Sequence, residues 1–120
     1  MNFEFDNNRP IFIQLAEEIK VYIITGKYKP GEKLPSVREF ALSFKINPNT
    51  VQKALVELEN EKLIFTERTN GKFVTKDEVL INNIKSNLAN QKINSFIVEM
   101  NNLGITKKEI ITYFKKGDNI

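Results

Sequence analysis

The chain has 120 residues, of which 41% are hydrophobic and 28% are charged, with a formal net charge of +3. This length suits one small domain, or a small domain with an appended element. The absence of cysteine and histidine excludes disulfides and thiolate metal sites, and it removes the commonest general base. We therefore expect no metal, no cofactor and no enzymatic activity, although carboxylates, lysine and tyrosine leave a small enzyme as an alternative.

The sequence has no targeting or membrane-spanning pattern. No run of residues approaches the roughly 20 apolar positions that a transmembrane helix needs. The first six residues are acidic and lack the basic and apolar regions of a signal peptide. We expect a cytoplasmic protein with no membrane partner.

Residues 1–9 form a lead-in, after which an apolar stripe predicts a first helix that Pro10 opens and Gly26 ends. Two prolines and two glycines then exclude a helix between residues 26 and 35. Tyr28 and Leu34 are expected to anchor this loop on the core. The predicted stripe comprises Ile11, Phe12, Leu15, Ala16, Ile19, Tyr22 and Ile23, while Glu17, Glu18 and Lys20 are expected to face water.

Two short helices joined by a tight turn are predicted next, which together make a helix-turn-helix. Ser36 and Glu39 have the spacing of a capping box at the start of the first of them. Asn47 is a suitable N-cap for the second, and Pro48 suits its first position. The predicted buried positions are Val37, Phe40, Ala41 and Phe44 in the first helix and Val51, Ala54, Leu55 and Leu58 in the second.

Polar side chains crowd the start of the second of these helices, off its apolar stripe. They can hydrogen-bond base edges and phosphates, and a helix N-terminus favours an anion. The alternative is an ordinary solvated face, but the flanking segments favour nucleic-acid binding. The four side chains are Asn49, Thr50, Gln52 and Lys53.

Arg38 falls in the first turn of the preceding helix, off its apolar stripe. A cation is unfavourable there because it opposes the helix dipole. A phosphate or a guanine partner would explain the arginine, and a local ion pair with Glu39 is the alternative.

Two strands are predicted at residues 63–67 and 72–75, so that a hairpin follows the helix-turn-helix directly and makes a winged helix. Asn70 and Gly71 are expected to supply the positive φ angles of a tight turn. Arg68 and Lys72 at the tip are expected to enter the minor groove or contact phosphates.

Positive charge is concentrated in two segments. Residues 26–53 carry six basic and two acidic side chains, and residues 68–76 carry three basic side chains and no acidic one. If the fold brings these segments together, they form one basic face, as expected of a nucleic-acid-binding protein.

From Lys76 onwards the pattern predicts a helix of about 23 residues that stops at Gly104. Thr106 and Glu109 form a second capping box, which opens a final helix. Two helices cannot bury all of these apolar side chains against each other. We expect a second copy of the chain to cover the surplus, and packing back onto the winged helix is the alternative. The predicted dimerisation residues are Leu80, Ile84, Leu88, Ile93, Phe96, Ile97, Met100, Ile110 and Phe114.

Motifs at residues 30–41, 46–55, 61–64 and 71–74 resemble the winged-helix DNA-binding domain of the GntR family of bacterial transcription regulators. They occur in the family's order and cover about half of the chain. Residues 47–51 and the short helical tail are similar to the YtrA-type subfamily. Members of that group typically dimerise through a two-helix tail and often repress ABC transporter operons, including their own genes.

The resemblance implies which side chains contact DNA. It makes Arg38 the family's DNA-binding arginine, on a helix that Ser36 caps, and it makes Gly71 the wing glycine. The family's wing usually has a further glycine where this chain has Thr69, and many members have a basic residue where this chain has Pro48, so tip geometry and base recognition should differ. The full set of predicted DNA-binding residues is Ser36, Arg38, Asn49, Thr50, Gln52, Lys53, Arg68, Asn70, Gly71 and Lys72.

We therefore expect a mainly α fold with a small β-hairpin wing. A winged helix-turn-helix at residues 1–75 would bind DNA, and a helical hairpin at residues 76–120 would dimerise. The expected function is sequence-specific repression of the chain's own operon, and of ABC transporter genes, from a palindromic operator. A winged helix used only for protein–protein interaction is the alternative. The sequence identifies no small-molecule effector.

Overall fold

A computed structural model describes residues 3–117, which form five helices and one two-stranded sheet. Two compact units, Met1–Asn83 and Ile84–Ile120, meet inside the fourth helix. We describe each unit by itself. The predicted class, a mainly helical winged helix-turn-helix with a β-hairpin, is confirmed.

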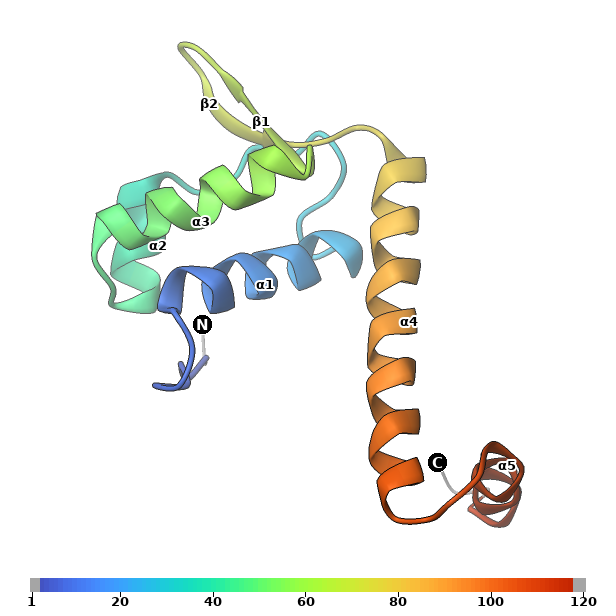
Figure 1. Ribbon diagram of the computed structural model, residues 1–120. Helices are drawn as coiled ribbons and strands as arrows, with labels where there is room; N and C mark the ends of the chain where they lie inside the picture. Colours follow the sequence, from blue (N-terminus) through green and yellow to red (C-terminus); the bar gives the residue numbers. More distant parts are fainter. Residues whose placement is uncertain (1–2, 118–120) are drawn as a thin grey trace. The chain divides into compact units, whose positions relative to one another are not determined.

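Three helices build the core of the first unit: α1 (Ile11–Ile24), α2 (Val37–Phe44) and α3 (Pro48–Asn60). The third helix packs on both of the others (Figure 1). The predicted stripes of α2 and α3 are buried, except that Val37 is only half-buried. Large side chains that are almost fully enclosed include Leu15, Ile19, Phe40, Val51, Leu55, Leu58, Leu63 and Val74.

The first helix departs from its predicted stripe. Ile11 is 39% exposed, whereas Gln14, which has no place in an apolar pattern, is only 4% exposed. The Gln14 amide donates to the carbonyls of Asp6 (2.6 Å) and Arg9 (2.9 Å) and accepts the Asp6 N–H (2.7 Å). These bonds satisfy the buried amide, and they fold the lead-in over the start of α1.

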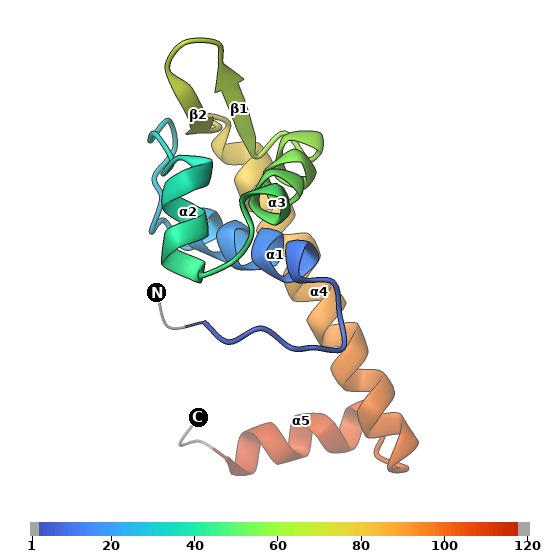
Figure 2. The same cartoon turned by 90° about the vertical axis from the view of Figure 1, so that its left-hand side faces the viewer.

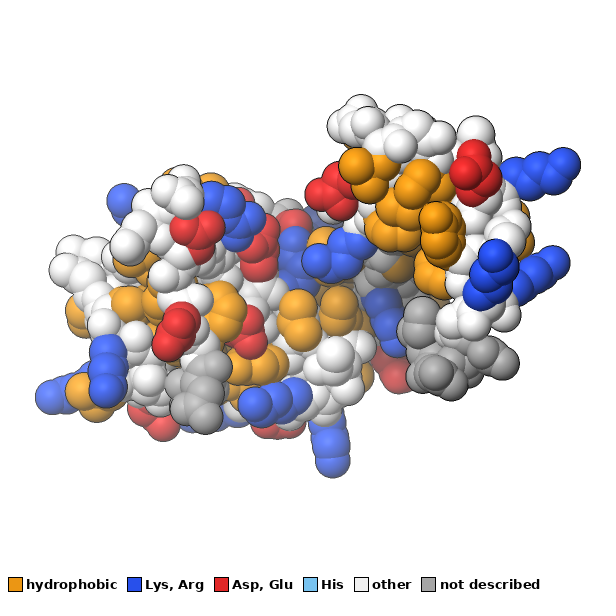
Figure 3. All heavy atoms as spheres, turned by 90° about the horizontal axis from the view of Figure 1, so that it is seen from below, with side chains coloured by type: hydrophobic (Ala, Val, Ile, Leu, Met, Phe, Trp, Pro, Cys, Tyr) orange, Lys and Arg blue, Asp and Glu red, His pale blue; other side chains and the backbone are white. Residues whose placement is uncertain are grey.

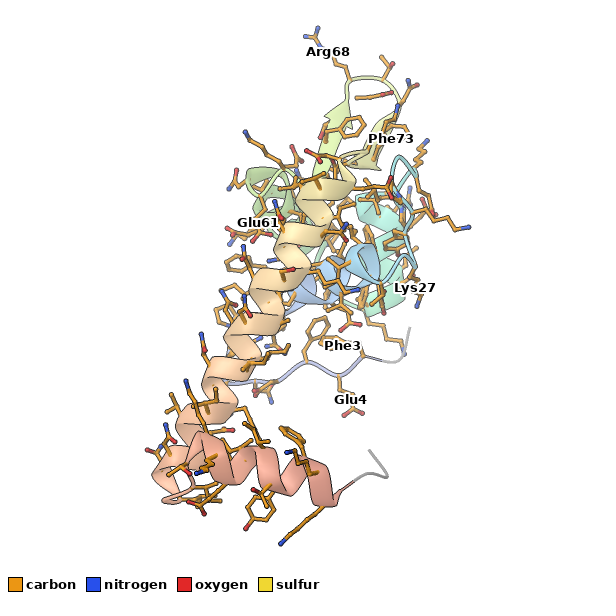
Figure 4. All side chains as sticks on the ribbon, turned by 90° about the vertical axis from the view of Figure 1, so that its right-hand side faces the viewer. Phe3, Glu4, Lys27, Glu61, Arg68 and Phe73 are labelled. Atoms are coloured by element: carbon orange, nitrogen blue, oxygen red, sulfur yellow. The ribbon has the colours of Figure 1, made fainter. Side chains whose placement is uncertain are left out.

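Two more contacts tie the chain together around α1. Lys20 was expected to face water, but its ammonium lies 2.7 Å from a carboxylate oxygen of Glu61 at the end of α3, and its side chain is 15% exposed. In the lead-in, the Phe5 ring packs 6.1 Å from the ring of Phe44 in α2. Figure 4 shows the lead-in, with Phe3 labelled, and the position of Glu61.

The starts of α2 and α3 have the predicted caps. The Ser36 hydroxyl accepts the Glu39 N–H at 3.1 Å, and the Glu39 carboxylate accepts the Ser36 N–H at 3.0 Å. The Asn47 side chain accepts the Asn49 N–H at 2.7 Å, with Pro48 in the first helical position. Local side-chain chemistry therefore sets where both helices begin.

Both helices end on a lysine in the left-handed region. Lys45 follows α2 with a φ of 57°, and Lys62 follows α3 with a φ of 63°. The N–H of the next residue then returns to a carbonyl five residues back, to Ala41 at 3.1 Å and to Leu58 at 3.0 Å. This is the bonding of a Schellman motif, in which glycine is usual. It turns the chain sharply into α3 and into the hairpin.

Strands β1 (Ile64–Glu67) and β2 (Gly71–Val74) form an antiparallel hairpin, the wing, which projects beyond the three helices (Figure 2). Glu67 pairs with Gly71, so the loop comprises residues 68–70, and β2 begins one residue earlier than predicted. Gly71 has a φ of 107°, whereas Asn70 does not take the positive φ predicted for it. A three-residue hairpin loop needs only one such position, and the Asn70 N–H instead donates to the Glu67 carbonyl at 3.1 Å.

The loop before α2 runs beside β2 and adds a third, strand-like segment to the wing. The Leu34 N–H donates to the Lys72 carbonyl at 2.8 Å, and the Val74 N–H donates to the Glu32 carbonyl at 2.9 Å. Tyr28 is 8% exposed and Leu34 is 3% exposed, so both anchor the loop as predicted.

The second unit contains most of α4 (Glu78–Asn102) and all of α5 (Lys107–Lys116). Gly104 ends α4 as predicted, with a φ of 77° and a bond of 3.0 Å from the Ile105 N–H to the Met100 carbonyl. The predicted capping box of Thr106 and Glu109 opens α5. Within the described residues, none of the helices combines the length and hydrophobicity required to cross a membrane.

Candidate nucleic-acid interface

The first two turns of α3 expose polar side chains opposite the buried stripe. Asn49, Gln52 and Lys53 are exposed, and Thr50 is half-buried. Because the apolar face of α3 is committed to the core, these side chains are the ones that α3 presents to solvent. The predicted recognition residues thus share one end of one helix.

Lys53 leans towards α1. Its ammonium lies 5.9 Å from the centroid of the Phe12 ring, at the rim of a shallow hollow of about 350 Å³ that Gln52 and Val56 also line. A cation at this distance is attracted to the ring face. The contact steadies the Lys53 stem while the side chain stays exposed.

Arg38 is exposed in the first turn of α2, and no ion pair to it occurs among residues 3–117. The local alternative, Glu39, is engaged elsewhere, because its carboxylate accepts the backbone N–H of Ser36. That hydrogen bond, with the Ser36 hydroxyl and nearby Lys33, lowers the pKa of Glu39. The Arg38 guanidinium is therefore open to a ligand.

A hollow of about 450 Å³, the wing hollow, lies between the start of α2 and the wing. It brings Ser36 together with four predicted residues of the wing, and Arg68 points outward at the tip (Figure 4). The two basic segments of the sequence meet here, although Glu39 and Glu67 also line it. The predicted wing residues on its wall are Arg68, Asn70, Gly71 and Lys72.

Lys72 does not lie at the tip. It belongs to β2, its side chain is 17% exposed, and its ammonium lies 2.5 Å from the Glu59 carboxylate and 2.8 Å from the Thr66 hydroxyl. The ion pair joins the wing to α3, so Lys72 orients the wing. Lys33, which was not predicted, also lines the hollow. The signals for it were its place in a net-basic segment and its closeness to the capping Ser36.

The second unit has a separate apolar surface. Hydrophobic side chains gather on this unit, at the upper right of Figure 3. They border a groove of about 410 Å³ between α4 and α5, the tail groove, with Lys107 at its rim. Ile93 is 53% exposed and Phe114 is 57% exposed, while Ile110 is buried. The groove is lined by Ile93, Phe96, Ile97, Lys107, Ile110, Ile111 and Phe114.

Four of the predicted dimerisation residues lie outside this groove. Leu80, Ile84, Leu88 and Met100 are half-buried and do not line it. Helical spacing alone grouped them with Ile93, whereas the position of α5 decides which apolar side chains flank the groove.

The polar groups of these surfaces suit anions and base edges. In the part of the chain that the structure describes, no three Asp or Glu side chains gather in a way that could hold an ion. The exposed amides, hydroxyls, lysines and arginines instead match the contacts that proteins make to phosphates and bases.

Comparison with known proteins gives consistent matches. The family model described as bacterial regulatory proteins, gntR family, matches residues 13–74. The chain is 34% identical over 115 residues to the uncharacterized HTH-type transcriptional regulator YhcF of Bacillus subtilis (strain 168), covering 96% of this chain and 95% of that protein. It is 32% identical over 111 residues to the HTH-type transcriptional repressor YtrA of the same strain, covering 92% and 85%.

Solved structures agree. A GntR family transcriptional regulator from Listeria monocytogenes is 43% identical, with a TM-score of 0.88 over 93% of this chain and 98% of that one. The AraR DNA-binding domain in complex with operator ORR3 is 31% identical, with a TM-score of 0.54 over 62% of this chain and 88% of that one. The chain therefore belongs to the GntR family, and it is a DNA-binding transcription regulator rather than an enzyme.

Proposed function

We propose that the chain is a dimeric repressor that places the start of α3 in the major groove of a palindromic operator. The observation that carries this proposal is the open polar start of α3, flanked by the wing hollow and by Arg38, which forms no ion pair within residues 3–117. Two relatives support it, since YtrA is named a repressor and the AraR domain was solved on an operator.

The side chains divide into base readers and backbone contacts. Asn49 and Gln52 carry amides, which can pair with the donor and acceptor of adenine, and Thr50 offers a hydroxyl. Lys53 and Arg68 contact phosphates on either side of α3, which sets the register of the helix without reading sequence. Arg38 binds a phosphate or a guanine beside them.

The remaining wing residues have supporting roles. Ser36 holds the helix that carries Arg38, and the Lys72–Glu59 ion pair holds the wing against α3. Gly71 and Asn70 shape the loop that presents Arg68. In this proposal the wing tip meets the minor groove or the adjacent backbone.

A second copy of the chain covers the tail groove. The groove is apolar, and several of its side chains are more than half exposed in the single chain. Two copies related by a two-fold axis would present two α3 helices, so the operator would have half-sites about one helical turn apart, or a multiple of it. The proposed targets, the chain's own operon and ABC transporter genes in the cytoplasm, follow from the subfamily resemblance.

The DNA-binding part is tested by removing the cation of Arg38. Arg38→Ala should weaken operator binding by roughly 5- to 150-fold, the discrimination that one good side-chain pair provides. Arg9→Ala is the matched control, because Arg9 is ion-paired with Glu17 in the lead-in and α1. Binding is measured by fluorescence anisotropy, with circular dichroism to check folding. Equal affinity of the two variants would refute the assignment.

The dimer is tested on two neighbouring aromatic residues of α5. Phe114→Glu places a charge in the tail groove and should give a monomer by light scattering. Tyr113→Glu is the control, since Tyr113 is 60% exposed but does not line the groove, and it should remain a dimer. A dimer that survives Phe114→Glu would show that the groove is not the interface.

A further inference from the structure

The loop before α2 carries a cation that the proposed function has not used. Lys33 lies in the strand-like segment beside β2, where its backbone forms an antiparallel β-bridge with Phe73. The neighbouring Leu34 is 3% exposed and donates its N–H to the Lys72 carbonyl at 2.8 Å. The backbone of Lys33 is therefore held on a rigid edge, although its side chain is exposed.

The stem of Lys33 crosses the wing at Gly71. A Cβ placed on Gly71 would lie 3.2 Å from Lys33 Cε and 4.0 Å from Lys33 Nζ. A side chain at position 71 would push the end of the Lys33 side chain aside by a few tenths of an ångström, and it would also be strained by the φ of 107°. Because Gly71 has no side chain, the Lys33 side chain has room to pass it and end beside the wing loop.

The other charged groups of the wing hollow are already engaged or point outward. Glu39 accepts the Ser36 N–H, Glu67 accepts the Asn70 side-chain amide at 3.2 Å, and Lys72 is paired with Glu59. Within residues 3–117, neither Lys33 nor Arg68 forms an ion pair. Lys33 and Arg68, neither of them ion-paired within residues 3–117, therefore line one hollow from the segment before α2 and from the wing.

We propose that Lys33 is a further phosphate-binding residue of the operator interface, seated between the wing and α2. The proposal rests on the proposed function, because the anion is a backbone phosphate of the DNA that α3 reads. The ammonium is exposed on a fixed backbone, and within residues 3–117 it forms no ion pair, although it lies near enough to the Glu39 carboxylate to lower the pKa of that group. It would add affinity to every DNA sequence alike, since phosphates carry no base information.

The test compares two lysines of the same loop. Lys33→Gln removes the charge in the hollow, whereas Lys29→Gln removes an exposed charge that does not line it. Binding to an operator duplex and to a scrambled duplex is measured between 50 and 200 mM salt. One phosphate contact adds about 0.9 to the slope of log affinity against log salt concentration. Between 50 and 200 mM salt, the affinity of wild type should therefore fall by a factor about 3.5 times larger than that of Lys33→Gln.

We expect the salt dependence of affinity to be weaker for Lys33→Gln than for wild type on both duplexes. Lys29→Gln should keep the salt dependence of wild type, and Lys33→Arg should restore it. Thermal melting verifies that each variant is folded. If Lys33→Gln and Lys29→Gln have equal slopes while wild type still prefers the operator, this proposal fails and the proposed function stands. If wild type shows no preference for any operator, the proposed function fails first.

Discussion

The two units of the chain treat their apolar side chains in opposite ways. The first unit encloses a core of its own, with Phe40, Leu55 and Leu58 at 0% exposure, although Leu42 and Val79 are exposed on its surface. The second unit leaves Ile93 at 53% and Phe114 at 57% exposure, and buries Ile110 at 6%. A fold that covers its own core can present polar groups to a ligand as a rigid body. A hairpin that leaves apolar side chains exposed offers a surface to a partner, and we propose that the partner is a second copy of the chain.

The largest expected effect is a contrast between two phenylalanines. Phe40→Ala should destabilise the first unit by about 3–5 kcal/mol, because it leaves a cavity in a closed core. Phe114→Ala should leave that unit's stability unchanged and weaken only the part of unfolding that depends on protein concentration. Urea unfolding at two protein concentrations, followed by circular dichroism, measures both. If the two variants lost equal free energy of unfolding at low protein concentration, this difference between the two units would be refuted.

A smaller effect is expected at the caps that begin α2 and α5. Ser36→Ala should cost about 1 kcal/mol in the first unit. The matching Thr106→Ala should weaken only the tail, since each hydroxyl accepts the N–H three residues on, from Glu39 or from Glu109. A loss of DNA binding with Thr106→Ala at concentrations where the dimer persists would contradict this division.

The Ser36 cap also predicts a pH dependence. The pKa of Glu39 is lowered in the folded chain, chiefly by the Ser36 backbone hydrogen bond. Its contribution to stability is therefore present above the pKa of the unfolded chain and is lost as the pH falls through the lowered folded value. The stability gap between wild type and Glu39→Gln should shrink in acid, which urea unfolding from pH 7 to pH 3 would reveal. A gap that widens in acid would have the wrong sign.

The smallest effect concerns the residues that end the helices. The second unit uses Gly104 in the left-handed position, whereas the first unit uses Lys62 with a φ of 63°. Lys62→Gly should stabilise by roughly 0.5 kcal/mol, because relief of the left-handed strain slightly exceeds the entropy cost of glycine. Lys62→Ala keeps the Cβ and should give no gain, and a shared gain would indicate that charge rather than backbone conformation is responsible. Thermal melting resolves the difference.

Much of the fold could be predicted because its signals are local. Caps at Ser36, Asn47 and Thr106 and the apolar stripes of α2 and α3 depend on residues within one or two turns. The burial of Gln14 could not be predicted, since its partners lie in a lead-in that has no periodicity. The positive φ predicted for Asn70 was wrong, because the strand register, with Glu67 opposite Gly71, leaves the left-handed position to Gly71.

The candidate site was predictable to the same extent. The polar start of α3 could be predicted from the sequence, because the buried and the exposed positions of this helix both lie within one short segment and follow helical spacing. The engagement of Lys72 depends on Glu59, which is thirteen residues away, and the position of Lys33 depends on Gly71 across the wing. Such pairings arise from tertiary structure, so composition and spacing could not reveal them.

Sequence-specific DNA binding is best tested by a salt titration. Binding of the full chain to the promoter DNA upstream of its own gene is compared with binding to a scrambled duplex of equal length. We expect a preference of about a thousandfold or more for the promoter duplex, within the range of specific regulators, and a steep salt dependence. Weak binding that is equal for both duplexes, or no binding to either, would contradict it and favour a winged helix that contacts other proteins.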